Sequence, residues 1–183
     1  NKDCQELLEL CRARNVLLIS DEIYDTFTYS DACEPSPLAG GSGVRCCPSP
    51  ARFPGAEKDV LLIRGFGKTY GVTGWRLGYA AGPRRLIEEI SKLQQYTFVC
   101  APSALQHGAI PCFDVDMSKQ IADYQQRRDM VVSRLSKVTE VTTPGGAFYA
   151  FVKVPERLKL TASQFIEKCL EKSVLVIPGN VFS

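Results

Sequence analysis

One lysine and one arginine stand eight residues apart in a glycine-rich turn, residues 65–78 (GFGKTYGVTGWRLG). The turn directly follows the apolar run 60–63 (VLLI), so a strand is expected to bring Lys68 to the rim of a sheet. The glycines allow the backbone to fold tightly around a bulky group. A lysine amine can act as a covalent nucleophile. The planar fork of Arg76 suits two phosphate oxygens in a way that a lysine does not.

The sequence Gly67-Lys68-Thr69 has the appearance of the end of a phosphate-binding P-loop. That motif requires another glycine five residues before Gly67, and the residue there is Leu62. The spacing therefore excludes a P-loop.

Two further segments carry groups suited to chemistry. Residues 16–24 (VLLISDEIY) are typical of a buried strand that ends in acidic and aromatic side chains, among them Asp21 and Tyr24. Residues 144–149 (PGGAFY) predict a turn that opens a strand. Taken singly, Asp21 also suits a helix cap or a loop carboxylate, Tyr24 a core aromatic and Arg76 a plain ion pair.

In this order, the three segments resemble the class I/II aminotransferases, which are pyridoxal-phosphate (PLP) enzymes of fold type I. The resemblance covers nearly the whole chain and runs unbroken from Gly65 to Gly78. It implies that Lys68 binds PLP covalently and that Arg76 grips the cofactor phosphate. It also implies that Asp21 meets the pyridine nitrogen and that Tyr24 meets the phenolic oxygen of the ring.

The sequence departs from the family pattern at Gly67, where many members have a serine whose hydroxyl helps to hold the phosphate. We therefore expect phosphate binding to depend more on backbone N–H groups and on Arg76. The family's upstream phosphate turn, ring-stacking aromatic residue and ring-oxygen asparagine would precede Asn1, and its substrate-binding arginine would follow Ser183. We interpret the chain as a piece of a longer homodimeric enzyme, truncated at both ends and inactive alone.

The elements that position these groups follow from the hydrophobic pattern. Strands and helices alternate to about residue 138, which favours an α/β sheet, and the remainder favours a smaller α+β unit. We assign residues 1–128 to the PLP-binding large domain, with a mixed and mostly parallel sheet, and residues 129–183 to an incomplete small domain. The predicted strands are 16–20, 60–63, 77–82, 147–152 and 174–177, and the predicted helices begin near residues 3, 83, 103, 116 and 161.

Two surface features are also predicted. Residues 31–58 are rich in proline and glycine, and we expect a long, mobile surface connection there. On the helix expected over 116–138, the arginines at 127, 128 and 134 are expected to form a solvated face. The indole of Trp75 is expected to pack rather than to take part in catalysis.

Composition narrows the class of protein. The 183 residues are 45% hydrophobic and 23% charged with a net charge of +2, which gives no reason to expect nucleic acid or an anionic membrane as partner. No apolar run approaches the roughly 20 residues that span a bilayer. The eight cysteines are scattered without a C-x-x-C pair, which predicts reduced thiols in a cytoplasmic protein and no metal site.

These observations predict a PLP-dependent aminotransferase that moves an amino group from an amino acid, with aspartate as the best single candidate, to a 2-oxo acid. Another fold-type-I PLP enzyme, such as a lyase or synthase, would use the same Lys68, Asp21 and Arg76. A PLP-binding regulatory module fused to a DNA-binding domain is the alternative from another class. A basic helix-turn-helix region upstream would identify that alternative.

Overall fold

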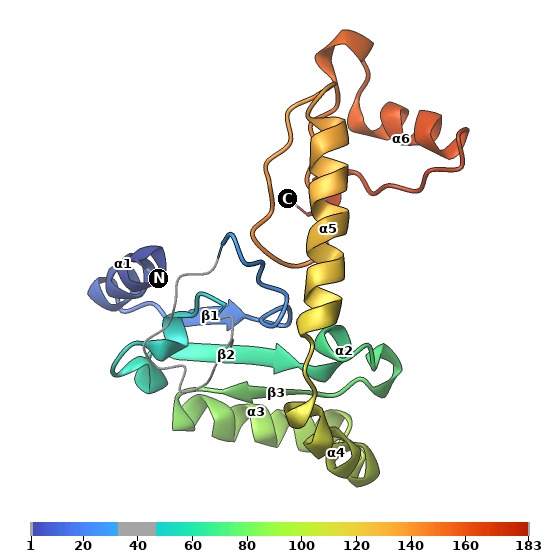
Figure 1. Ribbon diagram of the computed structural model, residues 1–183. Coiled ribbons are helices and arrows are strands. Elements are labelled where there is room, and N and C mark those ends of the chain that lie inside the picture. Colours follow the sequence, from blue (N-terminus) through green and yellow to red (C-terminus); the bar gives the residue numbers. More distant parts are fainter. Residues whose placement is uncertain (1, 33–46, 183) are drawn as a thin grey trace. The chain divides into compact units, whose positions relative to one another are not determined.

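A three-stranded mixed sheet, with the order β1-β2-β3, organises the first part of the protein (Figure 1). Strand β1 (Leu18–Asp21) runs parallel to β2 (Val60–Gly65), with Leu18 opposite Val60 and Asp21 opposite Ile63. Strand β3 (Gly78–Ala81) is antiparallel to β2. These are the predicted strands with shifted ends, and the parallel and antiparallel pairings together make the sheet mixed, as predicted.

The structure, a computed structural model, describes residues 2–32 and 47–182. The chain divides into two compact units, Asn1–Ile121 and Ala122–Ser183. In the described residues, no helix is both long enough and apolar enough to cross a membrane.

Three helices of the first unit begin where the sequence predicts, namely α1 (Lys2–Ala13), α3 (Arg84–Thr97) and α4 (Ser103–Ala109). A fourth, the short helix α2 (Phe66–Thr69), was not predicted and lies at the start of the glycine-rich turn. Prolines stand at the N-caps of α3 and α4, where a missing N–H costs nothing because the first turn leaves its N–H groups unpaired. Short 3-10 helices cover Pro50–Arg52, Ala56–Lys58, Thr73–Trp75 and Ile110–Asp114.

The connection between β1 and β2 is part of the core over its described residues. Leu8 of α1 packs with Ala56 and Val60, and all three side chains are buried. Phe53 and Leu18 pack against this cluster. The prediction of a mobile surface connection over 31–58 is therefore wrong for residues 47–58, because Pro50 and Gly55 here begin two 3-10 turns that pack apolar groups into the core. Residues 33–46 lie outside the described residues.

A second cluster holds the turn that follows β2. Phe66 and Leu77, from the two ends of that turn, are buried with Ala109 of α4. Trp75 packs against them, as predicted for this indole. The packing of α4 on the turn means that the backbone around Lys68 is supported by apolar contacts at both ends.

The second unit contains two predicted helices but not the predicted strands. Helix α6 (Ala162–Leu170) begins where predicted, with a capping box formed by Thr161 and Gln164. Most of α5 (Ser118–Leu135) also belongs to this unit. The strands expected at 147–152 and 174–177 are not formed, and the described residues there contain one isolated bridge, Val141 to Val152. Ala147 has a φ of 55°, which an extended strand does not allow.

The prediction that the arginines of α5 form a solvated face is wrong at one position. Arg127 and Arg134 are exposed, but the side chain of Arg128 is only 5% exposed. Its Nη1 donates to the carbonyl oxygen of Pro144 at 2.9 Å, and its Nη2 lies 2.7 Å from Asp129. Arg128 thus ties the helix to the start of the 144–149 segment, a long-range contact that helical periodicity does not encode.

Strand β1 is less covered than its apolar sequence suggests. Ile19 is 58% exposed, and Val16 and Leu17, at the start of the expected strand, are also exposed. Among the described residues β1 has a single neighbouring strand, β2. The prediction of a buried strand at 16–20 therefore holds only for the face that packs on Leu8.

Candidate active site

The parallel pairing of β1 and β2 brings two chemically active segments to one edge of the sheet. The carboxyl ends of parallel strands meet at the same edge, which is the usual ligand side of an α/β sheet. Asp21 is the last residue of β1, and Lys68 lies in α2, directly after β2. The Nζ of Lys68 lies 6.0 Å from the centroid of the Tyr24 ring. The amine and the phenol therefore face the same small region.

Asp21 presents an exposed carboxylate at this edge. Its Oδ1 accepts a hydrogen bond from the backbone N–H of Ile23 at 3.3 Å, which orients the group at the strand end. Because side chains alternate along a strand, Asp21 and Ser20 point to opposite faces of the sheet. The carboxylate of Glu22 accepts a hydrogen bond from the Ser20 hydroxyl at 3.0 Å and therefore lies on the face opposite Asp21.

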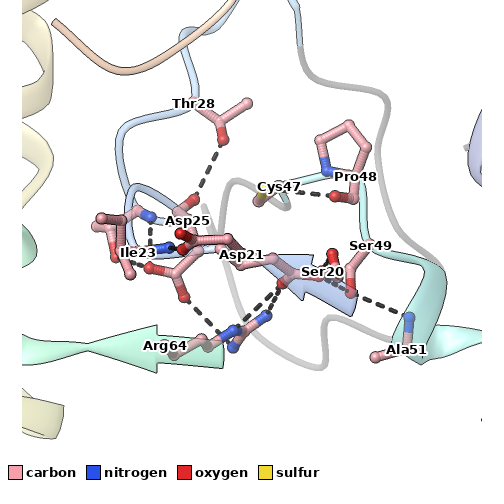
Figure 2. Close-up of polar contacts among 12 residues, drawn as sticks. Ser20, Asp21, Ile23, Asp25, Thr28, Cys47, Pro48, Ser49, Ala51 and Arg64 are labelled. Carbon is pink, nitrogen blue, oxygen red and sulfur yellow. Dashed lines mark hydrogen bonds and ion pairs between the residues drawn. The ribbon is translucent and has the colours of Figure 1, made fainter. Parts of the chain in front are cut away.

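A buried polar cluster occupies that opposite face (Figure 2). Arg64 of β2 is its centre, with Nη2 at 2.8 Å from Glu22 Oε2 and Nη1 at 3.3 Å from Asp25 Oδ2. Glu22 is 6% exposed and also accepts a hydrogen bond from the hydroxyl of Ser49. An ion pair removed from water in this way is expensive to break, because the remaining charge would be left unpaired.

The cluster changes the acidity of its members. Burial by itself would lower the pKa of Arg64, but its bonds and the charges of Glu22 and Asp25 outweigh burial and raise that pKa. Burial, together with the same two carboxylates, raises the pKa of the Cys47 thiol to about 11. Arg64 is therefore a permanent cation, and Cys47 is a protonated thiol at neutral pH.

The glycine-rich turn folds back on itself immediately after β2. The N–H of Phe66 donates to the carbonyl of Leu77 at 3.1 Å, which closes the turn. A Cβ atom at Gly78 would lie 2.7 Å from the Arg64 carbonyl oxygen, so only glycine allows β3 to approach β2 there. A Cβ at Gly67 would meet the Cα of Thr73 at 3.4 Å, so a small side chain fits beside Lys68.

Arg76 stands on the far limb of this turn. It is exposed, its φ is 52°, and its Nη1 donates to the carbonyl oxygen of Thr73 at 3.3 Å. A left-handed conformation is uncommon for a residue with a side chain and costs on the order of 1 kcal/mol. The turn maintains this conformation through the adjacent Leu77, whose carbonyl pairs with Phe66 and whose side chain is buried.

The structure thus brings Asp21, Tyr24 and Lys68 to one sheet edge and places Arg76 in the turn that contains Lys68. Sequence reasoning missed the cluster of Glu22 and Arg64. One signal was present: Arg64 is a charged residue within the otherwise apolar run that forms β2. An arginine in such a strand requires a buried partner, which identifies a carboxylate on a neighbouring strand as the group to look for.

The residues at this edge fit PLP in their chemistry. Lys68 supplies an amine for an aldehyde, Asp21 a carboxylate for a ring nitrogen, Tyr24 a phenol for a ring oxygen and Arg76 a guanidinium for a phosphate. The Thr69 hydroxyl, one residue after Lys68, is buried and has no hydrogen-bond partner among the described residues. Such an orphaned group indicates that a polar partner from outside this part of the chain is needed. Within the same residues, no group of three or more His, Cys, Asp or Glu side chains could hold a metal ion.

Comparison with known proteins assigns the family. The family model described as aminotransferase class I and II matches residues 1–183. The chain belongs to this family. The resemblance in the three sequence segments is therefore confirmed, and the α/β architecture agrees with that of fold-type-I aminotransferase structures.

The relatives include enzymes named for two kinds of substrate. The chain is 31% identical over 189 residues to an aspartate aminotransferase of Sulfolobus acidocaldarius, covering 99% of this chain and 44% of that protein. The crystal structure of the aspartate aminotransferase of Thermotoga maritima superposes with a TM-score of 0.84 at 30% identity, covering 100% of this chain and 44% of that one. The crystal structure of an aromatic aminotransferase of Pyrococcus horikoshii superposes with a TM-score of 0.86 at 31% identity, covering 100% of this chain and 47% of that one. The chain thus spans less than half the length of these relatives.

Proposed function

We propose that the full-length protein containing this chain is a PLP-dependent aminotransferase that moves an amino group from an amino acid to a 2-oxo acid. The observation that carries this proposal is the convergence of Lys68, Tyr24 and Asp21 at one sheet edge, with Lys68 Nζ 6.0 Å from the Tyr24 ring centroid. An amine, a phenol and a carboxylate in this arrangement match the functional groups of the PLP ring and its aldehyde.

Each residue has a distinct role in this proposal. Lys68 binds the cofactor aldehyde covalently, and Arg76 binds its phosphate through two parallel N–H···O contacts. Asp21 holds a proton on the ring nitrogen, because a carboxylate next to a pyridinium favours the charged form of both. Tyr24 donates a hydrogen bond to the ring oxygen.

The reaction requires removal of a weakly acidic proton from the α-carbon of the substrate. Bound PLP supplies an electron sink for the negative charge that remains. Once the amino group of the substrate has displaced Lys68 from the cofactor carbon, its freed Nζ is the group on this chain that takes up that proton and returns it, since a neutral amine is an effective base. By keeping the ring nitrogen protonated, Asp21 maintains the positive charge that makes proton loss favourable.

Aspartate, with 2-oxoglutarate as acceptor, is the substrate pair that we propose. Similarity to enzymes named aspartate aminotransferase supports this pair. Similarity to the aromatic aminotransferase of Pyrococcus horikoshii makes an aromatic amino acid the alternative amino donor to compare.

We place the enzyme in cytoplasmic amino-acid biosynthesis, as a homodimer. We assign residues 1–128 to its large PLP-binding domain and 129–183 to its small domain, with no nucleic acid or membrane as partner.

Reductive trapping tests the proposal. Borohydride treatment of the full-length protein with PLP should fix the cofactor on the peptide that contains Lys68, as read by mass spectrometry. Lys68→Ala should abolish the label and the transfer of amino groups while some cofactor remains bound through phosphate and ring contacts.

Lys92→Ala is the matched control, because Lys92 is an exposed lysine of α3 paired with Glu89 at 2.7 Å. This variant should retain both label and activity. Label on a lysine other than Lys68 would overturn the assignment, and absence of any PLP binding would overturn the proposed function.

A further inference from the structure

Arg64 connects two points of the turn that follows β1. Its guanidinium bonds to Glu22, the first residue after the strand, and to Asp25, three residues further on. The backbone N–H of Asp25 also donates to the carbonyl of Glu22 at 3.1 Å, so the turn is closed by main chain as well. Ile23 and Tyr24 lie between the two residues that Arg64 holds.

We propose that Arg64 is a positioning residue for the cofactor site, acting through Glu22 and Asp25 to hold Asp21 and Tyr24 in place opposite Lys68. This inference rests on the proposed function of the sheet edge. It adds a role for a side chain on the face of the sheet opposite Asp21.

The geometry explains why the carboxyl end of β1 needs support from side chains. Asp21 is the last residue of β1, and in the described part of the chain a single backbone bond, from Glu22 N–H to the Ile63 carbonyl at 2.8 Å, continues the pairing with β2 beyond it. The Asp21 carboxylate is itself exposed, and among the same residues it is oriented by a 3.3 Å bond from Ile23 N–H. A short strand end of this kind frays unless side chains secure it.

Arg64 also belongs to the strand that leads to Lys68. It lies four residues before Lys68, and its register partner on β3 is Tyr79. Burial by itself would lower the pKa of Arg64, but its bonds to Glu22 and the charge of Asp25 outweigh burial and keep that pKa raised. One cation therefore links the turn that carries Tyr24 to the strand that leads to Lys68.

The test is a double-mutant cycle in the full-length protein, read as PLP affinity by equilibrium dialysis. Arg64→Gln should weaken PLP binding about tenfold, because Asp21 and Tyr24 are no longer held in position. In an Asp21→Asn background the same substitution should weaken binding by no more than about threefold, since the main group that Arg64 positions has lost its charge. Equal fold-changes in the two backgrounds would overturn the proposal, because a general loss of folding does not depend on Asp21.

Two further variants keep the result interpretable. Glu22→Gln should weaken PLP binding in the same direction as Arg64→Gln, and should replace it in the cycle if Arg64→Gln does not fold. Arg64→Lys should recover part of the affinity, because an ammonium keeps the charge but cannot hold two carboxylates as the guanidinium fork does. No recovery by lysine together with unchanged affinity in Glu22→Gln would also contradict the proposal.

Arg12→Gln is the matched control. Arg12 forms a comparable ion pair with Asp59 at 2.7 Å and a bond to the Pro54 carbonyl, and Asp59 lies at the opposite end of β2 from Arg64. Its loss should lower thermal stability and leave PLP affinity unchanged. If the wild-type protein carries the Lys68 label but the cycle gives equal fold-changes in the two backgrounds, only the role of Arg64 is refuted. Wild-type protein that does not bind PLP would overturn both proposals.

Discussion

The amine of Lys68 and the ring of Tyr24 lie 6.0 Å apart, measured from Nζ to the ring centroid, although the two residues follow different strands. This proximity results from the parallel pairing of β1 and β2, which places both strand ends at one edge. It brings two of the three sequence segments that resemble aminotransferase motifs into one site.

Asp21→Asn should lower the rate of amino-group transfer about 100-fold or more with the fold retained. The amide has the size of the carboxylate but no charge to hold a proton on the ring nitrogen. Steady-state kinetics with aspartate and 2-oxoglutarate, together with circular dichroism, measure the two effects.

Glu22→Gln distinguishes Asp21 from its acidic neighbour. The carboxylate of Glu22 is bound by Arg64 and Ser49 on the other face of the sheet, so it is not a substitute partner for the ring. Loss of the Glu22 charge in Glu22→Gln should therefore reduce activity less than loss of the Asp21 charge in Asp21→Asn. Activity of Asp21→Asn within a few-fold of the parent would remove Asp21 from the site.

Arg76→Ala should weaken PLP binding by roughly tenfold to a hundredfold. A bidentate, charge-assisted pair with phosphate contributes on the order of 1.5–3 kcal/mol, and Gly67 provides no hydroxyl to share the phosphate. Arg76→Lys should recover only part of the affinity, because an ammonium does not reproduce the fork. Equilibrium dialysis of PLP against each variant gives the comparison.

Arg84→Ala is the control for Arg76, since Arg84 is an exposed arginine of α3 paired with Glu88. Its PLP affinity should equal that of the parent protein. Unchanged affinity in Arg76→Ala would separate Arg76 from phosphate binding and weaken the assignment of the whole turn.

Cys47 should be slow to alkylate at pH 8. Its pKa of about 11, raised by burial and by Glu22 and Asp25, leaves about one thiol in a thousand as the reactive thiolate. The rate should rise with pH up to about that pKa, because deprotonation creates the nucleophile. Iodoacetamide labelling followed by peptide mass spectrometry measures it.

Cys100, which is exposed, provides the internal comparison in the same sample. Glu22→Gln should speed labelling of Cys47 modestly, because removing a neighbouring negative charge lowers the pKa while burial remains. Labelling of Cys47 as fast as Cys100 at pH 8 would show that the cluster does not surround this thiol.

Arg128→Gln should lower the free energy of unfolding by about 2 kcal/mol. The buried guanidinium donates to the Pro144 carbonyl at 2.9 Å, and a glutamine is too short to keep this bond and the pairing with Asp129 together. Urea denaturation measures the change. Arg134→Gln, an exposed position on the same helix, should stay within about 0.5 kcal/mol of the parent, and an equal effect of both variants would contradict the assigned role of Arg128.

Much of the local structure was predictable because its signals are local. The capping box of Thr161 and Gln164, the prolines before α3 and α4, and the apolar run of β2 each determine an element through neighbouring residues. The strands expected at 147–152 and 174–177 did not form, because a strand requires a partner that sequence periodicity does not supply.

The sequence by itself determined the identity of the candidate site residues, since Asp21, Tyr24, Lys68 and Arg76 stand at characteristic spacings in three segments that resemble one family. Only the tertiary structure decided how they are held. The parallel register of β1 and β2 brings Lys68 to Tyr24, and the pairing of Arg64 with Glu22 fixes the opposite face. Contacts of this kind join residues far apart in the chain, and their formation depends on which strands pair and which faces are buried.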